Sequence, residues 1–124
     1  VILIISYILK VFYNKFFYKK ETFSNNYKFK LYYANWCPHC KDIIKINDKD
    51  KDKDWNKLSK YLKNNKINNN NIECESIDCV KNKSKCKKIK GYPTIKLYKN
   101  NKEIDYNGKR NYDSFISFLK SECS

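Results

Sequence analysis

The segment Cys37-Pro38-His39-Cys40 constrains this chain most, because it follows a predicted strand and opens a predicted helix. Residues 27–33 alternate apolar and lysine side chains, which is the period of a strand. Pro38 suits a first helical turn, where its missing N–H is not needed. Cys37 would then lie among the unpaired N–H groups of a helix N-terminus, which favour a thiolate, and Cys40 would lie one turn later, within disulfide reach. The pattern predicts thiol–disulfide exchange.

A zinc site is the alternative for these cysteines, with Cys79 and Cys86 as the second pair of ligands. Zinc ligands usually come in closely spaced pairs, whereas six residues separate Cys79 from Cys86. His39 is the only histidine, which excludes a histidine-based zinc cluster, and two glycines exclude glycine-rich phosphate loops. We therefore expect no metal.

The chain is strongly basic, with 27 Lys and Arg against 13 Asp and Glu, a net charge of +14 over 124 residues. The length allows one domain. Such an excess is compatible with a scaffold on nucleic acid or anionic lipid, but the sequence lacks base-stacking motifs. Because lysine and asparagine are abundant together, we attribute the excess to codon bias and expect no specific nucleic-acid partner.

The apolar and polar periods predict the order β-α-β-α-β-β-α. After the strand at 27–33, a helix from Pro38 runs to about Leu62, with a polar kink or loop at 47–54. The later elements are a strand, a short basic helix stopped by Gly91, a hairpin across Asn100-Asn101 and an amphipathic helix. These are expected at residues 72–78, 80–89, 94–98 with 103–106, and 112–119.

The N-terminal segment differs from the rest of the chain. Residues 1–9 are almost purely apolar, and aromatic residues mixed with lysines follow. We expect residues 1–20 to form an apolar, then basic, helix that anchors the protein in a membrane as a transmembrane segment. A buried amphipathic helix or the apolar region of a signal peptide are the alternatives. Residues 21–26 are expected to be a linker, and residues 27–124 the domain.

The motifs resemble those of thioredoxin-fold proteins, and most of all the domains of protein disulfide isomerases, over residues 27–121. A tryptophan before the paired cysteines and a Gly-Tyr-Pro-Thr stretch before a strand carry most of this resemblance. The Pro-His dipeptide between the cysteines is that of the bacterial oxidase DsbA. The shared landmarks are Ala34 to Lys41, Ile77-Asp78-Cys79, Cys86, Gly91 to Thr94, Tyr106, Gly108 and Arg110.

The resemblance implies an α/β thioredoxin fold with a central four-stranded mixed sheet flanked by helices. It makes Cys37 the nucleophile and Cys40 the buried resolving thiol. It makes Pro93 a cis-proline that, with Tyr92, presents backbone to an extended substrate. Trp36 would shield one side of the site.

Other roles also follow from the resemblance. Pro38 and His39 would tune the reactive thiolate, and Arg110 would help to ionise Cys40. A pair matching Cys79 and Cys86 forms a structural disulfide in some isomerase domains. Cys74 and Cys123 have no counterpart in the family.

The sequence departs from the family at three places. The family often buries an acid six residues before the first cysteine, and that position is Leu31 here. Isomerases pair this acid with a lysine, and the position of that lysine is Ser76 here. The first strand and helix of the family are not visible either. Without the acid, Cys40 lacks a local base, so we expect oxidation of substrates to be faster than their reduction.

The sequence therefore predicts a thiol–disulfide oxidoreductase acting on protein cysteines, an oxidase or isomerase rather than a reductase. The expected partners are cysteine-containing substrates, a redox partner protein and a membrane, with no cofactor. The domain is expected in an oxidising compartment, such as a secretory lumen, or at a virion or surface membrane. The alternative is a non-catalytic thioredoxin-like module that binds extended peptides at Pro93.

Overall fold

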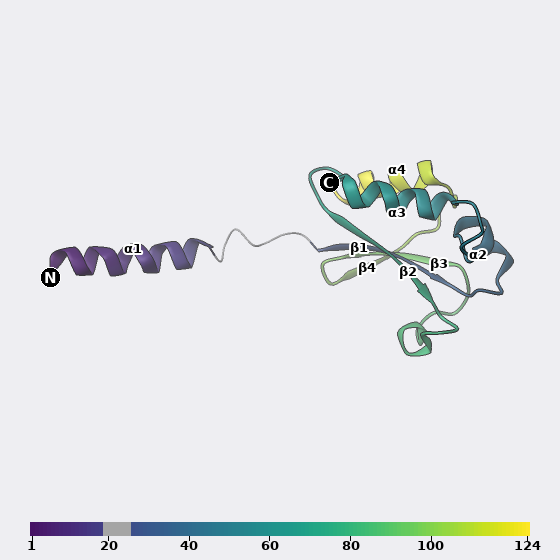
Figure 1. Ribbon diagram of the computed structural model, residues 1–124, viewed down its shortest axis with the longest axis horizontal. Helices are drawn as coiled ribbons and strands as arrows, with labels where there is room; N and C mark the ends of the chain where they lie inside the picture. Colours follow the sequence, from purple (N-terminus) through teal and green to yellow (C-terminus); the bar gives the residue numbers. More distant parts are fainter. Residues whose placement is uncertain (19–25) are drawn as a thin grey trace.

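The computed structural model describes residues 1–18 and 26–124, with a four-stranded sheet at its centre (Figure 1). The strands and helices follow the predicted order closely. The strands are β1 (Tyr27–Tyr33), β2 (Ile72–Asp78), β3 (Thr94–Lys99) and β4 (Lys102–Asp105). The helices are α1 (Ile2–Tyr18), α2 (Pro38–Ile43), α3 (Asp54–Asn64) and α4 (Tyr112–Glu122), with a 3-10 turn, η1 (Lys83–Cys86).

The sheet has the order β2-β1-β3-β4 and is mixed. β1 and β2 are parallel, and Tyr27 lies opposite Ile72. β1 and β3 are antiparallel, and Leu31 lies opposite Ile95. The antiparallel hairpin β3–β4 turns at Asn100, which has a φ of 57° and so occupies a region that asparagine tolerates. Because β1 is central, the loop that leaves its carboxyl end is held on both sides.

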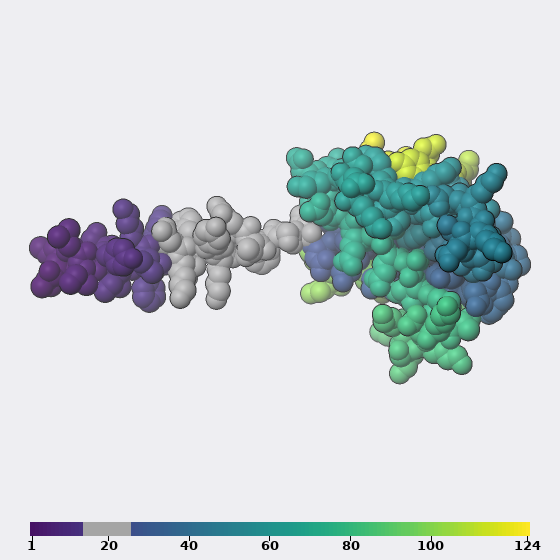
Figure 2. All heavy atoms as spheres, viewed as in Figure 1, coloured from purple at the N-terminus to yellow at the C-terminus, as the bar shows by residue number. Residues whose placement is uncertain are grey.

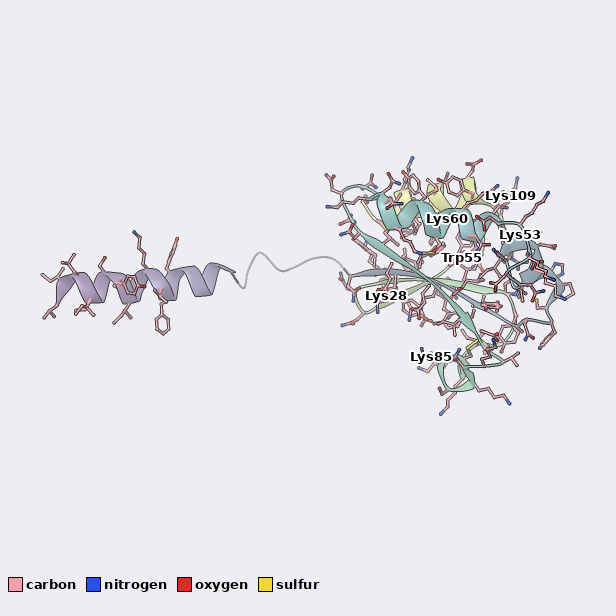
Figure 3. The ribbon with its side chains drawn as sticks, viewed as in Figure 1. Lys28, Lys53, Trp55, Lys60, Lys85 and Lys109 are labelled. Carbon is pink, nitrogen blue, oxygen red and sulfur yellow. A yellow bond between two sulfur atoms is a disulfide. The ribbon has the colours of Figure 1, made fainter. Side chains whose placement is uncertain are left out.

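The main core lies between one face of the sheet and the helices α3 and α4 (Figure 1). Phe29 of β1 is fully buried there and packs against Trp55 and Phe115, with ring centroids 5.2 Å and 6.0 Å away. Figure 3 shows Trp55 between α3 and the sheet. This aromatic cluster fixes both helices on the sheet.

The polar stretch at 47–54 separates α2 from α3, as its composition predicts. The Asp50 carboxylate accepts the backbone N–H of Asn47 at 3.0 Å, which stabilises a turn. The Asn56 side chain accepts the N–H groups of Lys45 and Lys53 at 2.9 Å and 3.1 Å. Side-chain acceptors thus replace the helical hydrogen bonds across this interruption.

The opposite face of the sheet carries charged pairs, because the lysines of β1 alternate with its core residues. Lys28 lies 3.9 Å from Glu73, and Lys30 lies 3.6 Å from Glu75, each across the parallel β1–β2 pair. Lys30 also lies 5.0 Å from the centre of the Tyr98 ring. Cross-strand charge pairing lets this face remain in contact with water.

The predicted helix at 80–89 is wrong: only η1 forms there. Cys79 and Cys86 form a disulfide with Cα atoms 5.7 Å apart, whereas seven residues of α-helix would separate them by about 10 Å. The Asp78 carboxylate also accepts the N–H of Val80 at 3.0 Å, which begins a turn. The loop projects from the body of the domain as a lobe (green in Figure 2), and it carries Lys85, which is exposed (Figure 3).

The N-terminal helix α1 stands apart from the domain (Figure 1), and the side chains of residues 1–13 are exposed. The expected transmembrane anchor at residues 1–20 is not supported. Within residues 1–18 and 26–124, no helix has both the length and the apolar character needed to cross a bilayer. The predicted linker at 21–26 lies outside the described residues except for Asn26.

Candidate active site

Cys37 lies at the junction of β1 and α2, at the N-cap position of the helix. Its Sγ accepts a hydrogen bond from the backbone N–H of Cys40 at 3.4 Å. Pro38 occupies the first turn of α2, where it displaces no hydrogen bond. The strand–helix junction predicted from the sequence thus aims a backbone donor at the sulfur of Cys37, and such a donor stabilises a thiolate.

The two cysteines share a small buried cluster with Ala34. Cys40 and Ala34 are fully buried and Cys37 nearly so, and Tyr33 and Tyr92 pack around them. Both cysteines are free thiols, so the geometry is that of the reduced form.

The Tyr92–Pro93 loop closes the other side of the cluster. The Cys37 thiol donates to the carbonyl oxygen of Tyr92 at 3.7 Å. The peptide bond between Tyr92 and Pro93 is cis, which is the geometry that the family resemblance implies. The loop therefore brings backbone groups directly beside the sulfur of Cys37.

The Cys40 thiol is held protonated. Its pKa is raised to about 12, first by burial and then by its hydrogen bond with Cys37. A backbone hydrogen bond from Ala34 and the positive charge of Arg110 lower this pKa, but by less. Position 31, where the family often has an acid, holds a fully buried leucine in the main core. A solvent-shielded thiol of high pKa fits the expected resolving cysteine.

The other predicted site residues surround the cysteines at the surface. Trp36 is 64% exposed and meets the Tyr92 ring edge to face at 6.2 Å. Pro38, His39 and Arg110 are exposed. Trp36 and Tyr92 thus form an aromatic rim beside Cys37, and Arg110 acts on Cys40 through its charge.

The remaining cysteines stand outside this cluster. Cys79 and Cys86 are bonded to each other, so they cannot complete a zinc site with Cys37 and Cys40. Among the described residues, no group of three or more His, Cys, Asp or Glu side chains could hold a metal ion. Cys74 and Cys123 are free thiols, and burial raises the pKa of both, that of Cys74 to about 12.

A polar pocket next to the cis-proline was not predicted from the sequence. It has a volume of about 550 Å³, and Pro93 and Arg110 form part of its wall. Lys88 and Lys90, from the loop after η1, line it as well. The lysine-rich run at 81–90 was visible in the sequence, but only the fold shows which of these lysines face the site.

Comparison with known proteins identifies the family. The sequence profile described as thioredoxin matches residues 18–121. Protein disulfide-isomerase of Gallus gallus is 31% identical over 116 residues, which are 91% of this chain and 20% of that protein. Protein disulfide-isomerase of Drosophila melanogaster is 35% identical over 90 residues, 71% of this chain and 16% of that protein. The chain therefore spans about a fifth or less of the length of these relatives.

Solved structures agree on the fold. The first thioredoxin domain of mouse Protein disulfide-isomerase A4 superposes with a TM-score of 0.63 at 24% identity, covering 90% of this chain and 70% of that one. The zinc-bound form of human ERp44 gives a TM-score of 0.64 at 21% identity, covering 80% of this chain and 27% of that one. The chain belongs to the thioredoxin family, and its domain resembles those of protein disulfide-isomerases.

Proposed function

We propose that this protein exchanges thiols and disulfides with cysteine-containing proteins, with Cys37 as the attacking and leaving sulfur and Cys40 as the resolving sulfur. The placement of Cys37 carries the proposal. Its sulfur lies at a helix N-cap, 3.4 Å from the Cys40 N–H and 3.7 Å from the Tyr92 carbonyl oxygen. A sulfur with a backbone donor on one side and substrate-pairing backbone on the other is suited to form and release a mixed disulfide.

The oxidising reaction balances in two steps. A substrate thiolate attacks Cys37 Sγ of the Cys37–Cys40 disulfide, so the S–S bond breaks and Cys40 leaves and takes up a proton. A second substrate thiolate then attacks the substrate sulfur of the mixed disulfide, and Cys37 leaves as a thiolate. Two electrons pass from the substrate to the protein, and a partner protein that carries a disulfide takes them up to restore the starting state.

The environment of Cys40 supports the oxidising direction. The mixed disulfide has two fates: attack by Cys40 releases the substrate with its thiol, and attack by a second substrate thiol releases an oxidised substrate. Burial is the largest cause that raises the Cys40 pKa, and it persists in the mixed disulfide, so little of Cys40 is thiolate at neutral pH and its attack is slow. The Pro-His dipeptide shared with DsbA supports the same direction.

An oxidising compartment fits this proposal. The Cys79–Cys86 disulfide would be reduced in a cytosol that keeps thiols reduced, and it persists in oxidising spaces. The similarity to protein disulfide-isomerases supports the same assignment. Trp36, His39 and Arg110 are proposed as tuning residues, and Tyr92 and Pro93 as the surface that pairs with substrate.

Trapping of a mixed disulfide tests the function. A Cys40→Ser variant, incubated with a reduced protein substrate under mild oxidation, should accumulate a substrate adduct on Cys37 that reductant releases. A Cys37→Ser variant should form none, and a Cys74→Ser variant should behave like the wild type. A peptide-binding module without catalysis would bind substrate equally in all three variants and form no adduct.

A further inference from the structure

We propose that the pocket beside Pro93 is a subsite for acidic side chains, so that the protein selects substrate cysteines flanked by Asp or Glu. This inference rests on the proposed exchange at Cys37 and names its substrate class. The occupant is an acidic peptide segment of the substrate, next in sequence to the reacting cysteine.

The position of the pocket links it to the reacting sulfur. Gly91 and Pro93, on either side of Tyr92, both line the pocket, while the Tyr92 carbonyl itself accepts the Cys37 thiol at 3.7 Å. A peptide that pairs with the backbone at Tyr92 therefore runs past the mouth of the pocket within a residue or two of its reacting cysteine.

The charge of the lining is positive and largely unneutralised. Four cations line the pocket against a single acid, Asp105. Lys96 already pairs with that acid at 3.2 Å and with Glu103 at 2.6 Å. The other three cations, Lys88, Lys90 and Arg110, form no ion pair with any carboxylate of the described residues.

The fold holds these three cations at one place. Cys86 is bonded to Cys79 at the end of β2, and the N–H of Ile89 donates to the Cys86 carbonyl at 3.1 Å. This turn fixes the backbone of the segment that carries Lys88 and Lys90 beside the cis-proline loop. The Tyr106 hydroxyl donates to the Lys109 carbonyl, which holds the loop before Arg110 against the domain. A preformed cluster of cations needs little reorganisation to bind carboxylates.

The matched substrates are dithiol peptides of one sequence, with three Glu, three Gln or three Lys beside the reacting cysteine. With oxidised wild-type protein at low ionic strength, the Glu peptide should be oxidised about five- to tenfold faster than the Lys peptide, since each exposed ion pair contributes a factor of about two to five. The Gln peptide should fall between them, and 0.5 M salt should remove most of the difference.

Two double variants locate the effect. Lys88→Gln with Lys90→Gln should lose most of the preference for Glu over Lys. Lys83→Gln with Lys85→Gln makes the same change in net charge on the same loop, outside the pocket lining, and should retain the preference. Equal rates for the Glu and Lys peptides at low salt, or equal losses in both double variants, would overturn the subsite.

A small reductant with no peptide segment separates this inference from the proposed function. Dithiothreitol attacks as a thiolate but has no flanking side chains to fill the subsite, so its rate of reaction with the Cys37–Cys40 disulfide should change by a similar, small factor in the two double variants, which remove the same number of charges. If dithiothreitol fails to reduce that disulfide, the proposed exchange itself is wrong. If dithiothreitol reacts normally but the peptides are not distinguished, only the acidic subsite is wrong.

Discussion

The Cys37 thiol donates to the Tyr92 carbonyl oxygen at 3.7 Å, although the two residues are 55 positions apart in the chain. This contact joins the N-terminus of α2 to the loop before β3, and both segments are held by the central strand β1 and its neighbour β3. The Cys37 sulfur, proposed to attack, and the Tyr92 backbone, proposed to pair with substrate, are therefore positioned by the two paired strands β1 and β3. Their relative placement does not depend on either loop alone.

Cys37 should be the first thiol alkylated in the reduced active site at pH 7. Burial raises the pKa of Cys40 and Cys74 to about 12 and also raises that of Cys123, so about one part in 10⁵ of Cys40 or Cys74 is thiolate at pH 7. Brief treatment with iodoacetamide followed by peptide mapping measures the order of labelling. A Cys37→Ser variant serves as the control and should lose the fast label. Labelling of Cys40 or Cys74 ahead of Cys37 would contradict the assignment.

Much of the fold was predictable because the strands have a clear period. The strands 27–33 and 72–78 appear with the predicted bounds, since apolar and lysine residues alternate in the first and a polar loop precedes the second. The closing helix follows from the spacing of Tyr112, Phe115 and Leu119. The strand–helix junction at Cys37 could be predicted from the sequence because Pro38 favours a first helical turn.

Features that depend on contacts between distant segments could not be predicted from the sequence in this way. The helix predicted at 80–89 fails because a disulfide across seven residues requires a closer approach than a helix allows, and local propensity does not contain that constraint. The cationic pocket likewise combines a loop at Lys88 and Lys90 with a distant segment at Arg110. Sequence spacing gives no indication that these segments meet.

Removing the Cys79–Cys86 disulfide should lower the free energy of unfolding by about 2–3 kcal/mol, because the bond restricts a short loop in the unfolded chain. Denaturant unfolding of a Cys79→Ala, Cys86→Ala double variant measures the loss. Alanine avoids a buried unpaired hydroxyl, since both positions are buried in the cluster around Tyr32 and Ile77. Wild-type protein unfolded in strong reductant is the matched control and should approach the variant. A loss below about 1 kcal/mol would contradict a structural role for the bond.

Deleting residues 1–25 should leave the domain folded and able to exchange disulfides. The side chains of residues 1–13 are exposed, and the sheet face opposite α3 and α4 carries ion pairs that let it remain in contact with water. Circular dichroism and thermal unfolding of the truncated chain measure folding, and reaction with dithiothreitol measures exchange. Loss of the cooperative transition in the truncated chain would show that the N-terminal segment contributes to the core.

The rate at which Cys40 resolves a mixed disulfide should rise by nearly tenfold per pH unit from pH 6.5 to 8.5. The thiolate attacks, and burial, the largest cause that raises the Cys40 pKa in the dithiol form, persists in the mixed disulfide, so the thiolate fraction of Cys40 keeps increasing throughout this range. The measurement prepares a mixed disulfide of Cys37 with a neutral thiol at low pH and follows its release after a pH jump. A plateau below pH 9 would show that Cys40 ionises more easily than its burial implies.

Two substitutions test the groups that set this pKa. Arg110→Ala removes a charge that lowers the Cys40 pKa, so resolution should slow several-fold at a given pH, whereas Arg110→Lys should retain most of the rate.

Leu31→Glu restores an acid at the position where the family often buries one and should speed resolution at neutral pH by supplying a proton acceptor. Leu31→Gln introduces a side chain of nearly the same shape as glutamate but without that base, so it should not speed resolution. Because Leu31 is fully buried, both variants must first be shown to fold by circular dichroism. A folded Leu31→Glu protein that resolves no faster than Leu31→Gln would mean that protonation of Cys40 does not limit this step.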